Sequence, residues 1–261
     1  MRGARGRPKG WDEGDRVKAL DRALRVLTAL AERPGLGLSD LGRELGEAPA
    51  TLHRILATLA AHDMAETDAE QGWHIGPGAF RVGSAFLRRT SLVARAQPIL
   101  RSLMEETGET ANLGVVRGGE VLFLAQAETH AAIRAFFPPG ALSPLHSSGI
   151  GKAVLAALPP ARRIATLTGP LEGFTPHTLT TEAALTADLA ATAARGWAVD
   201  AEERHEGMRC IACAVRDPSG APVAGLSVSG PAARMQAAGE ERVGRAVVAR
   251  ARELSAALGA G

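Results

Sequence analysis

The spacing of hydrophobic residues changes near residue 95, and this change predicts two domains of different construction. Before it, apolar side chains recur every three or four positions, which is typical of amphipathic helices. Beyond it, short apolar runs alternate with helical stretches, which indicates an α+β domain. We expect a basic flexible arm over residues 1–14, a helical domain over 15–76, a linker helix over 77–95 and a larger domain over 96–261.

The first helix of the helical domain is predicted to begin after Asp15, whose carboxylate can cap a helix, and to end at Arg33-Pro34-Gly35. We expect its buried face to consist of the apolar residues at helical spacing, Val17, Leu20, Leu24 and Leu27. This helix would form the support on which the next two helices pack.

The next two helices are predicted to form a helix-turn-helix. A short helix from Ser39 ends at Gly46, where a left-handed residue is needed, and Pro49 suits the first turn of the following helix. The expected buried positions are Leu41 and Leu45 on the first and Leu52, Ile55, Leu56 and Leu59 on the second. Two helices joined by a tight turn are typical of DNA-binding domains, whose second helix enters the major groove.

The outward residues of the second of these helices favour DNA as the partner. Ala50, Thr51, His53 and Arg54 are small, polar or basic, so this face can approach phosphates without charge repulsion. Thr51 and His53 can hydrogen-bond to bases or phosphates, and Arg54 can contact guanine with two hydrogen bonds. Residues 64–66 and 73–75, joined by a turn, are predicted to form the two-stranded wing.

The N-terminal arm carries a second basic motif. Arg5-Gly6-Arg7-Pro8-Lys9 is similar to the core of an AT-hook, in which arginines enter a narrow minor groove. Arg5 and Arg7 are therefore candidate DNA contacts, although a solvated tail has the same composition.

The pattern of the second part predicts strands and helices in alternation. Strands 111–116 and 120–126 flank the turn Gly118-Gly119, which indicates a hairpin. Further strands are expected at 197–200, 209–215 and 223–229, with helices near 152–158, 182–195 and 240–258. Between the domains, the expected linker helix offers an apolar face made of Phe80, Val82, Phe86 and Leu87.

Composition excludes several other classes of protein. The net charge is only +2, and no apolar run reaches the roughly 20 residues that cross a bilayer, so we expect a cytoplasmic protein without a membrane partner. The only cysteines, Cys210 and Cys213, are three positions apart in a predicted strand and should face opposite sides of it. We therefore expect neither a zinc site nor a cofactor.

Several motifs in this order resemble the IclR family of transcription regulators over nearly the whole chain. Ahead of the family's signature, the matching motifs are residues 20–24, 51–56, 107–110, 144–146 and 149–153. The family's signature is matched by Gly196, Asp200, Glu203, Cys210-Ile211-Ala212, Val215 and Asp217. The resemblance implies a winged helix-turn-helix, a GAF-like effector-binding domain, and dimers or tetramers on a DNA operator with dyad symmetry.

The resemblance also implies an effector site in the second domain. By matched position, the backbone amides of Gly149 and Ile150 would bind an anion at a helix N-terminus, and further polar contacts would come from Asp200, Cys210, Ser227 and Ser229. Alternation along residues 225–229 independently places both serines on one face. Residues 133–137 are expected to supply an apolar wall.

These groups suit a small carboxylate. A 2-oxo acid such as glyoxylate or pyruvate is the first expectation, and an aromatic acid such as protocatechuate is the alternative. Asp200 beside an anion requires either a protonated carboxyl or a donor group on the ligand.

Two other classes of function remain as alternatives. His146-Ser147-Ser148-Gly149 could belong to a hydrolase, but it lacks the GxSxG turn that exposes a nucleophilic serine. A metal sensor could use His177, Asp200, His205 and Cys210, although their spacing is not compact. We therefore predict a DNA-binding regulator rather than an enzyme.

Overall fold

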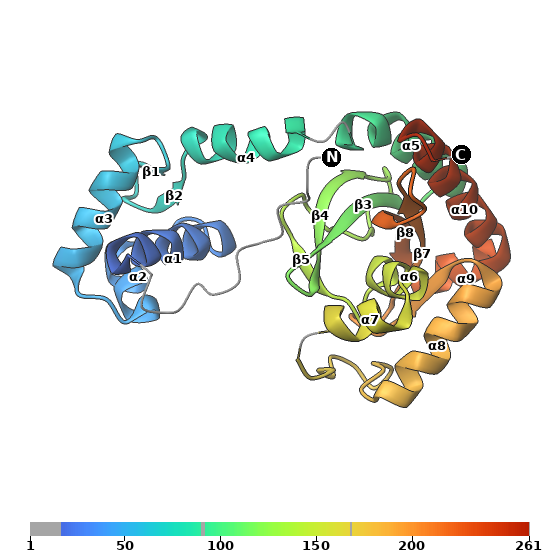
Figure 1. Cartoon of the computed structure of the whole chain (residues 1–261). Helices are drawn as coiled ribbons and strands as arrows, with labels where there is room; N and C mark the ends of the chain where they lie inside the picture. The colour runs from blue at the N-terminus through green and yellow to red at the C-terminus, as the bar shows by residue number, and fades with distance from the viewer. Residues whose placement is uncertain (1–16, 90–91, 168, 261) are drawn as a thin grey trace, which may run out of the picture. The chain divides into compact units, whose positions relative to one another are not determined.

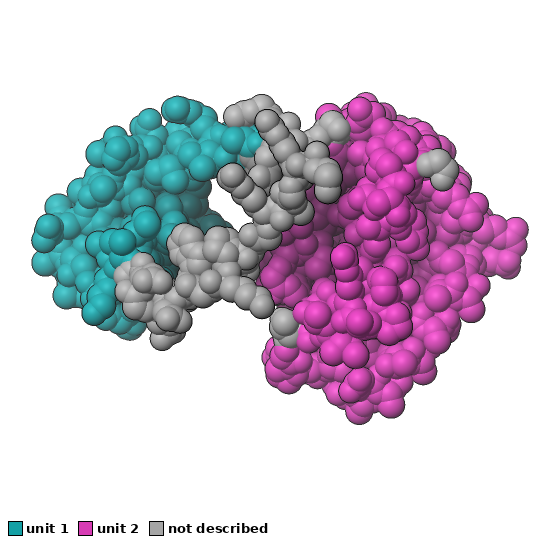
Figure 2. Space-filling view, in the orientation of Figure 1, with its two compact units in different colours: residues 1–89 teal, residues 90–261 magenta. Residues whose placement is uncertain are grey.

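A computed structural model describes residues 17–89, 92–167 and 169–260, and the chain divides into two compact units, residues 1–89 and 90–261 (Figures 1 and 2). The proposed arm over 1–14, with Arg5 and Arg7, and the predicted capping residue Asp15 lie outside the described residues. Within the described part of the chain, no helix is long and apolar enough to cross a membrane.

The first unit contains a helical bundle and a two-stranded ribbon, as the sequence predicts (Figure 1). Its elements are α1 (Lys18–Glu32), α2 (Leu38–Leu45), α3 (Pro49–Ala61), β1 (Ala65–Thr67), β2 (Trp73–Ile75) and α4 (Pro77–Arg89). The strands β1 and β2 are antiparallel, and Leu36 forms one further bridge to Trp73. The expected helix-turn-helix and wing are therefore both present.

The turn between α2 and α3 follows the predicted backbone chemistry. Gly46 ends α2 in the left-handed conformation, with φ 65° and ψ 30°. Pro49 then lies in the first turn of α3, and Leu52, Leu56 and Leu59 of α3 are buried in the core of this unit. Three of the four positions predicted to be buried in α3 are therefore confirmed, and the fourth, Ile55, is partly buried against the same core.

The buried face of α1 differs from the prediction. Val26, Ala29 and Leu30 are buried, whereas Val17, Leu20 and Leu24 are exposed at 66%, 57% and 54%. Both sets are spaced for one helix face, and the leucine-rich set is the more hydrophobic, which is why periodicity alone favours it. Packing against α2, α3 and the ribbon buries the neighbouring stripe instead and leaves Val17, Leu20 and Leu24 on the surface of the chain. The fourth residue of the predicted set, Leu27, is partly buried against the core.

The expected single linker helix over 77–95 is also wrong. The chain forms two helices there, α4 and α5 (Leu92–Thr107), and α5 belongs to the second unit. Within the chain, Phe80 and Val82 of α4 are exposed. The side chains of residues 86–89 lie outside the described set.

The second unit is built on one antiparallel sheet of six strands in the order β5-β4-β3-β8-β7-β6 (Figure 1). The strands are β3 (Thr110–Arg117), β4 (Glu120–Ala127), β5 (Leu142–Pro144), β6 (Ala198–Ala201), β7 (Met208–Arg216) and β8 (Pro222–Pro231). The helices are α5, α6 (Gly149–Ala157), α7 (Pro160–Thr166), α8 (Glu182–Arg195), α9 (Ala232–Ala238) and α10 (Glu240–Ala257). The sequence analysis did not anticipate β5, α7 and α9.

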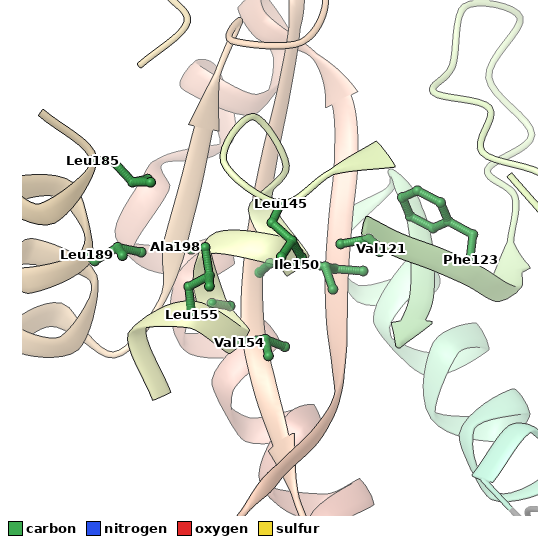
Figure 3. Packing of buried hydrophobic residues seen from close by; sticks show 11 residues of the cluster. Val121, Phe123, Leu145, Ile150, Val154, Leu155, Leu185, Leu189 and Ala198 are labelled. Atoms are coloured by element: carbon green, nitrogen blue, oxygen red, sulfur yellow. The ribbon is translucent and has the colours of Figure 1, made fainter. Parts of the chain in front are cut away.

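The sheet is covered on both faces. Helices α5 and α10 pack on one face, and α6 packs on the other, with α8 beside α6. Figure 3 shows Ile150 and Val154 of α6 over the strands, between Val121 of β4 and Leu189 of α8. Ile150 lies so close to the sheet that a Cβ at Gly225 would be 2.7 Å from its Cγ2 atom. This face of the sheet therefore needs glycine where α6 crosses it.

The conformation of Gly46 leads to a stability prediction. Gly46→Ala places an L residue in the left-handed region, which lowers the stability of the fold by about 1 kcal/mol. No atom lies within 4 Å of the new Cβ, so a steric clash adds nothing to this loss. We expect faster hydrogen exchange in the peptides covering α2 and α3 of this variant. Gly46→Asn, which tolerates this conformation better, is the control and should lose less protection. Equal protection in the wild type and Gly46→Ala would contradict the prediction.

Candidate functional site

Polar side chains from four adjacent strands gather on the face of the sheet that α6 covers. Asp200 of β6 pairs with Cys210 of β7, which pairs with Ser229 of β8. One row further along, Ser227 of β8 pairs with Asn112 of β3. Because side chains alternate along a strand, the two serines share the face of Gly225, which is the face packed against Ile150.

The N-terminus of α6 lies directly over this polar group. Ser148 caps the helix, and its Oγ accepts a hydrogen bond from the amide of Gly151 at 3.2 Å. The amides of Gly149 and Ile150 have no hydrogen-bond acceptor among the described residues. Unpaired amides and the helix dipole together attract an anion.

Gly149 is the point at which α6 touches the strand β7. A Cβ at this position would lie 2.7 Å from Cys210 Sγ and 3.3 Å from the Cβ of Ala212. The structure therefore brings Gly149, Asp200, Cys210, Ser227 and Ser229 together. Ile150 contributes its amide to the same place, while its side chain is part of the hydrophobic core.

Asn112 completes the polar group, and the sequence analysis missed it. Its Nδ2 donates to Ser227 Oγ at 3.4 Å and to Ser229 Oγ at 3.3 Å, and all three side chains are buried. The sequence did contain a signal for this residue. Asn112 is a polar side chain between Ala111 and Leu113 in a predicted strand of mostly apolar residues, and a buried polar side chain requires a hydrogen-bond partner.

The carboxyl group of Asp200 titrates near neutrality. Burial, and then the negative charge of Glu203, raises the pKa of Asp200 to about 7. Its Oδ1 accepts a hydrogen bond from the amide of Glu203 at 2.8 Å. A substantial fraction of this carboxyl is therefore protonated at pH 7 and can act as a hydrogen-bond donor.

A buried ion cluster lies next to Asp200. Lys152 of α6 is completely buried, and its Nζ lies 2.5 Å from Glu203 Oε1 and 3.1 Å from Asp188 Oδ2 of α8. Burial raises the pKa of Glu203, although Lys152 opposes this shift. A buried ammonium is stable only when it is paired, so the cluster joins α6, α8 and the turn after β6.

The two cysteines face opposite sides of β7, as predicted. Cys210 lies under α6, whereas Cys213 lies near Arg252 of α10. Burial, and then the charge of Asp200, raises the pKa of Cys210 to about 11, so its thiol is neutral. Among the described residues, no group of three or more His, Cys, Asp or Glu side chains could hold a metal ion.

The segment expected to form an apolar wall is divided between the interior and the surface. Ala135 is buried and Phe137 stacks on Phe123 with ring centroids 4.9 Å apart, whereas Ile133 and Phe136 are exposed. Arg234 holds this segment, since its guanidinium donates both to Glu109 and to the carbonyl of Ile133.

In the first unit, the candidate DNA contacts lie on one side of α3. Ala50, His53 and Arg54 are exposed, and Thr51 is half-buried. Thr51 and Arg54 line a cleft together with Ala19, Arg22 and Ala23 of α1. Two contacts of Asp68 stabilise the wing. Asp68 Oδ2 lies 2.6 Å from His74 Nε2, and Asp68 Oδ1 accepts a hydrogen bond from the amide of Gly72.

Comparison with known protein families finds matches to both units. The model of the IclR helix-turn-helix domain matches residues 19–69, and the model of the C-terminal domain of the bacterial transcriptional regulator IclR matches residues 84–256. The HTH-type transcriptional regulator BhcR of Paracoccus denitrificans is 53% identical, over 96% of this chain and 93% of its own length. The HTH-type transcriptional repressor AllR of Escherichia coli K12 is 37% identical, over 93% and 91%.

Solved structures share the fold. An IclR homologue of Microbacterium hydrocarbonoxydans, crystallised in complex with 4-hydroxybenzoate, matches with a TM-score of 0.79 and 26% identity. The match covers 93% of this chain and 100% of that chain.

The contact between α6 and β7 leads to a second prediction. Gly149→Ala forces the new methyl group against Cys210 Sγ, and such overpacking costs about 1–3 kcal/mol. We expect a corresponding fall in the free energy of unfolding in urea. Adding Cys210→Ala removes the sulfur and should restore part of the loss, with Cys210→Ala alone as the control. A loss that the second substitution leaves unchanged would exclude this contact as its cause.

Proposed function

Because the chain belongs to the IclR family of bacterial transcriptional regulators, we propose that a small carboxylate bound in its second unit controls the binding of the first unit to operator DNA. The family and the helix-turn-helix make the chain a DNA-binding transcription regulator. Its relatives are named as regulators and repressors, so it is not an enzyme.

The convergence of unpaired amides with buried polar side chains supports the effector site. A carboxylate placed at the N-terminus of α6 can accept hydrogen bonds from the amides of Gly149 and Ile150. Ser227 and Ser229 can use their hydroxyl protons for the same ligand, because Asn112 already donates to their oxygen atoms. We infer a small 2-oxo acid, such as glyoxylate or pyruvate, as the effector.

The titration of Asp200 removes the main objection to an anion at this place. An ionised carboxylate would repel the ligand, whereas a protonated one donates a hydrogen bond to it. With a pKa of about 7, Asp200 can take up a proton when the anion arrives. Proton uptake would then be part of effector binding near neutral pH.

An aromatic acid is the second candidate effector. The relative from Microbacterium hydrocarbonoxydans was crystallised with 4-hydroxybenzoate, which also carries a carboxylate. Protocatechuate belongs to the same chemical class and serves as its representative in the binding experiment below.

The DNA-binding mode follows from the exposure of α3. The small side chain of Ala50 would let the helix approach the major groove closely, and Thr51, His53 and Arg54 would contact base edges and phosphates there. The wing would contact the neighbouring backbone, and Arg5 and Arg7 would enter the minor groove. A dimer or tetramer would place two such units on an operator with dyad symmetry.

Loss of the Arg54 guanidinium tests the DNA-binding mode. We expect Arg54→Ala to bind DNA from the chain's own promoter region about 5- to 150-fold more weakly, since a bidentate base contact contributes ~1–3 kcal/mol. Fluorescence anisotropy at several salt concentrations measures this effect. Arg245→Ala, on an exposed face of α10, is the control and should bind as the wild type does. Unchanged binding by Arg54→Ala would show that Arg54 is not a DNA contact.

The pH dependence of calorimetric titrations tests the effector site. Raising the pH through about 7 deprotonates Asp200 and turns a donor into a repelling charge. We therefore expect the affinity of the full chain for glyoxylate to fall about tenfold per pH unit above this value. Asp200→Asn keeps a donor and should bind with little pH dependence, whereas the exposed-site control Glu241→Gln should behave as the wild type.

Pyruvate and protocatechuate, titrated in parallel, distinguish the two effector classes. Tighter binding of protocatechuate would favour the aromatic acid. No binding of any of the three acids would rule out the site as proposed.

A further inference from the structure

Asn112 has one side-chain polar atom without a partner among the described residues. Its side chain is completely buried, and its Nδ2 is used by the two serines, but its Oδ1 has no hydrogen-bond donor among the described residues. Buried amide oxygens are normally paired, so an unpaired one inside a polar group indicates a missing donor. Such a donor has to come from outside the described chain.

The neighbours of Asn112 among the described residues form their hydrogen bonds with other groups. Gln126 is opposite Asn112 on β4, but its Nε2 donates to Glu128 and its Oε1 accepts from the amide of Phe137. Ser227 and Ser229 accept from Asn112 Nδ2, and both hydroxyl groups also form hydrogen bonds with Cys210. The thiol of Cys210 is next to these serines and is a weak donor.

The other groups at this place are mostly donors. The amides of Gly149 and Ile150, the two serine hydroxyls and the protonated form of Asp200 all suit the oxygen atoms of a carboxylate. Asn112 Oδ1 suits only a group that carries a proton. The site therefore combines a region that recognises an anion with one acceptor for a hydroxyl or similar donor.

We propose that Asn112 is an effector-binding residue whose Oδ1 accepts a hydrogen bond from a hydroxyl group on the carbon next to the effector's carboxylate. This inference rests on the proposed function of the same site. It narrows the effector to 2-hydroxy acids and to the hydrated form of 2-oxo acids, in which a geminal diol replaces the carbonyl. A keto oxygen cannot donate a hydrogen bond. An acid without a hydroxyl group on the carbon next to its carboxylate likewise leaves Asn112 Oδ1 unpaired.

Glyoxylate and pyruvate differ in this respect. Glyoxylate is largely hydrated in water and carries two hydroxyl groups, whereas pyruvate is mainly in its keto form. Asn112 should therefore favour glyoxylate over pyruvate. Rejection of a ligand that leaves a buried polar group unpaired is a strong source of selectivity.

Two matched pairs of acids test this assignment. Glycolate and acetate differ by one hydroxyl group, as do lactate and propionate, and each acid can be titrated calorimetrically into the full chain in competition with glyoxylate. In the wild type we expect each hydroxy acid to bind at least about tenfold more tightly than its partner without the hydroxyl. In Asn112→Leu, which keeps the side-chain size, this preference should disappear, so that within this variant each hydroxy acid binds no more tightly than its partner without the hydroxyl.

Two further variants separate recognition from folding. Asn112→Ser keeps an acceptor in a smaller side chain and should retain part of the preference, and it replaces Asn112→Leu if the latter fails to fold by circular dichroism. Thr107→Val removes a buried hydroxyl of α5 that bonds to the carbonyl of Leu103, and it should leave the preference unchanged.

The outcomes distinguish this inference from the proposed function. A wild type that binds acids without preferring the hydroxyl, or an Asn112 variant that weakens all acids by the same factor, overturns the role of Asn112 alone. A wild type that binds none of the acids overturns both the role of Asn112 and the effector site.

Discussion

The close approach of α6 to the sheet is the constraint on which the second unit depends. Both points of contact are glycines: Gly149 lies against Cys210, and Gly225 lies under Ile150. At either glycine a Cβ would be only 2.7 Å from an atom of the neighbouring side chain. This proximity places the unpaired amides of α6 over Asp200, Ser227 and Ser229. It also brings Lys152 within reach of Glu203, so that the same helix supports both the proposed anion site and the ion cluster next to it.

Local chemistry made much of the fold predictable. The helix over Glu182–Arg195 was expected at its observed bounds, and Gly118-Gly119 correctly indicated the hairpin of β3 and β4. The buried face of α1 was not predictable, because two stripes of the helix are apolar and only packing decides between them. The end of α4 was missed for a similar reason, since helical periodicity continues into α5.

The candidate site was only partly predictable. The resemblance pointed to Asp200, Cys210 and the serines, and strand alternation correctly placed both serines on one face. Asn112 requires knowledge of strand pairing, because its partners are more than a hundred positions away in the sequence. The charge state of Asp200 depends on burial and on Glu203, neither of which a sequence pattern reveals.

The neutral thiol of Cys210 has a consequence for the chemistry of the sensor. Thiols react with oxidants and with electrophilic carbonyl groups chiefly as thiolates, and a pKa of about 11 keeps the thiolate scarce. The proposed carboxylate effector can therefore lie against this sulfur without forming a covalent adduct, and little thiolate is present to attack peroxide. The regulator would then respond to the concentration of a metabolite independently of the redox state of the cell.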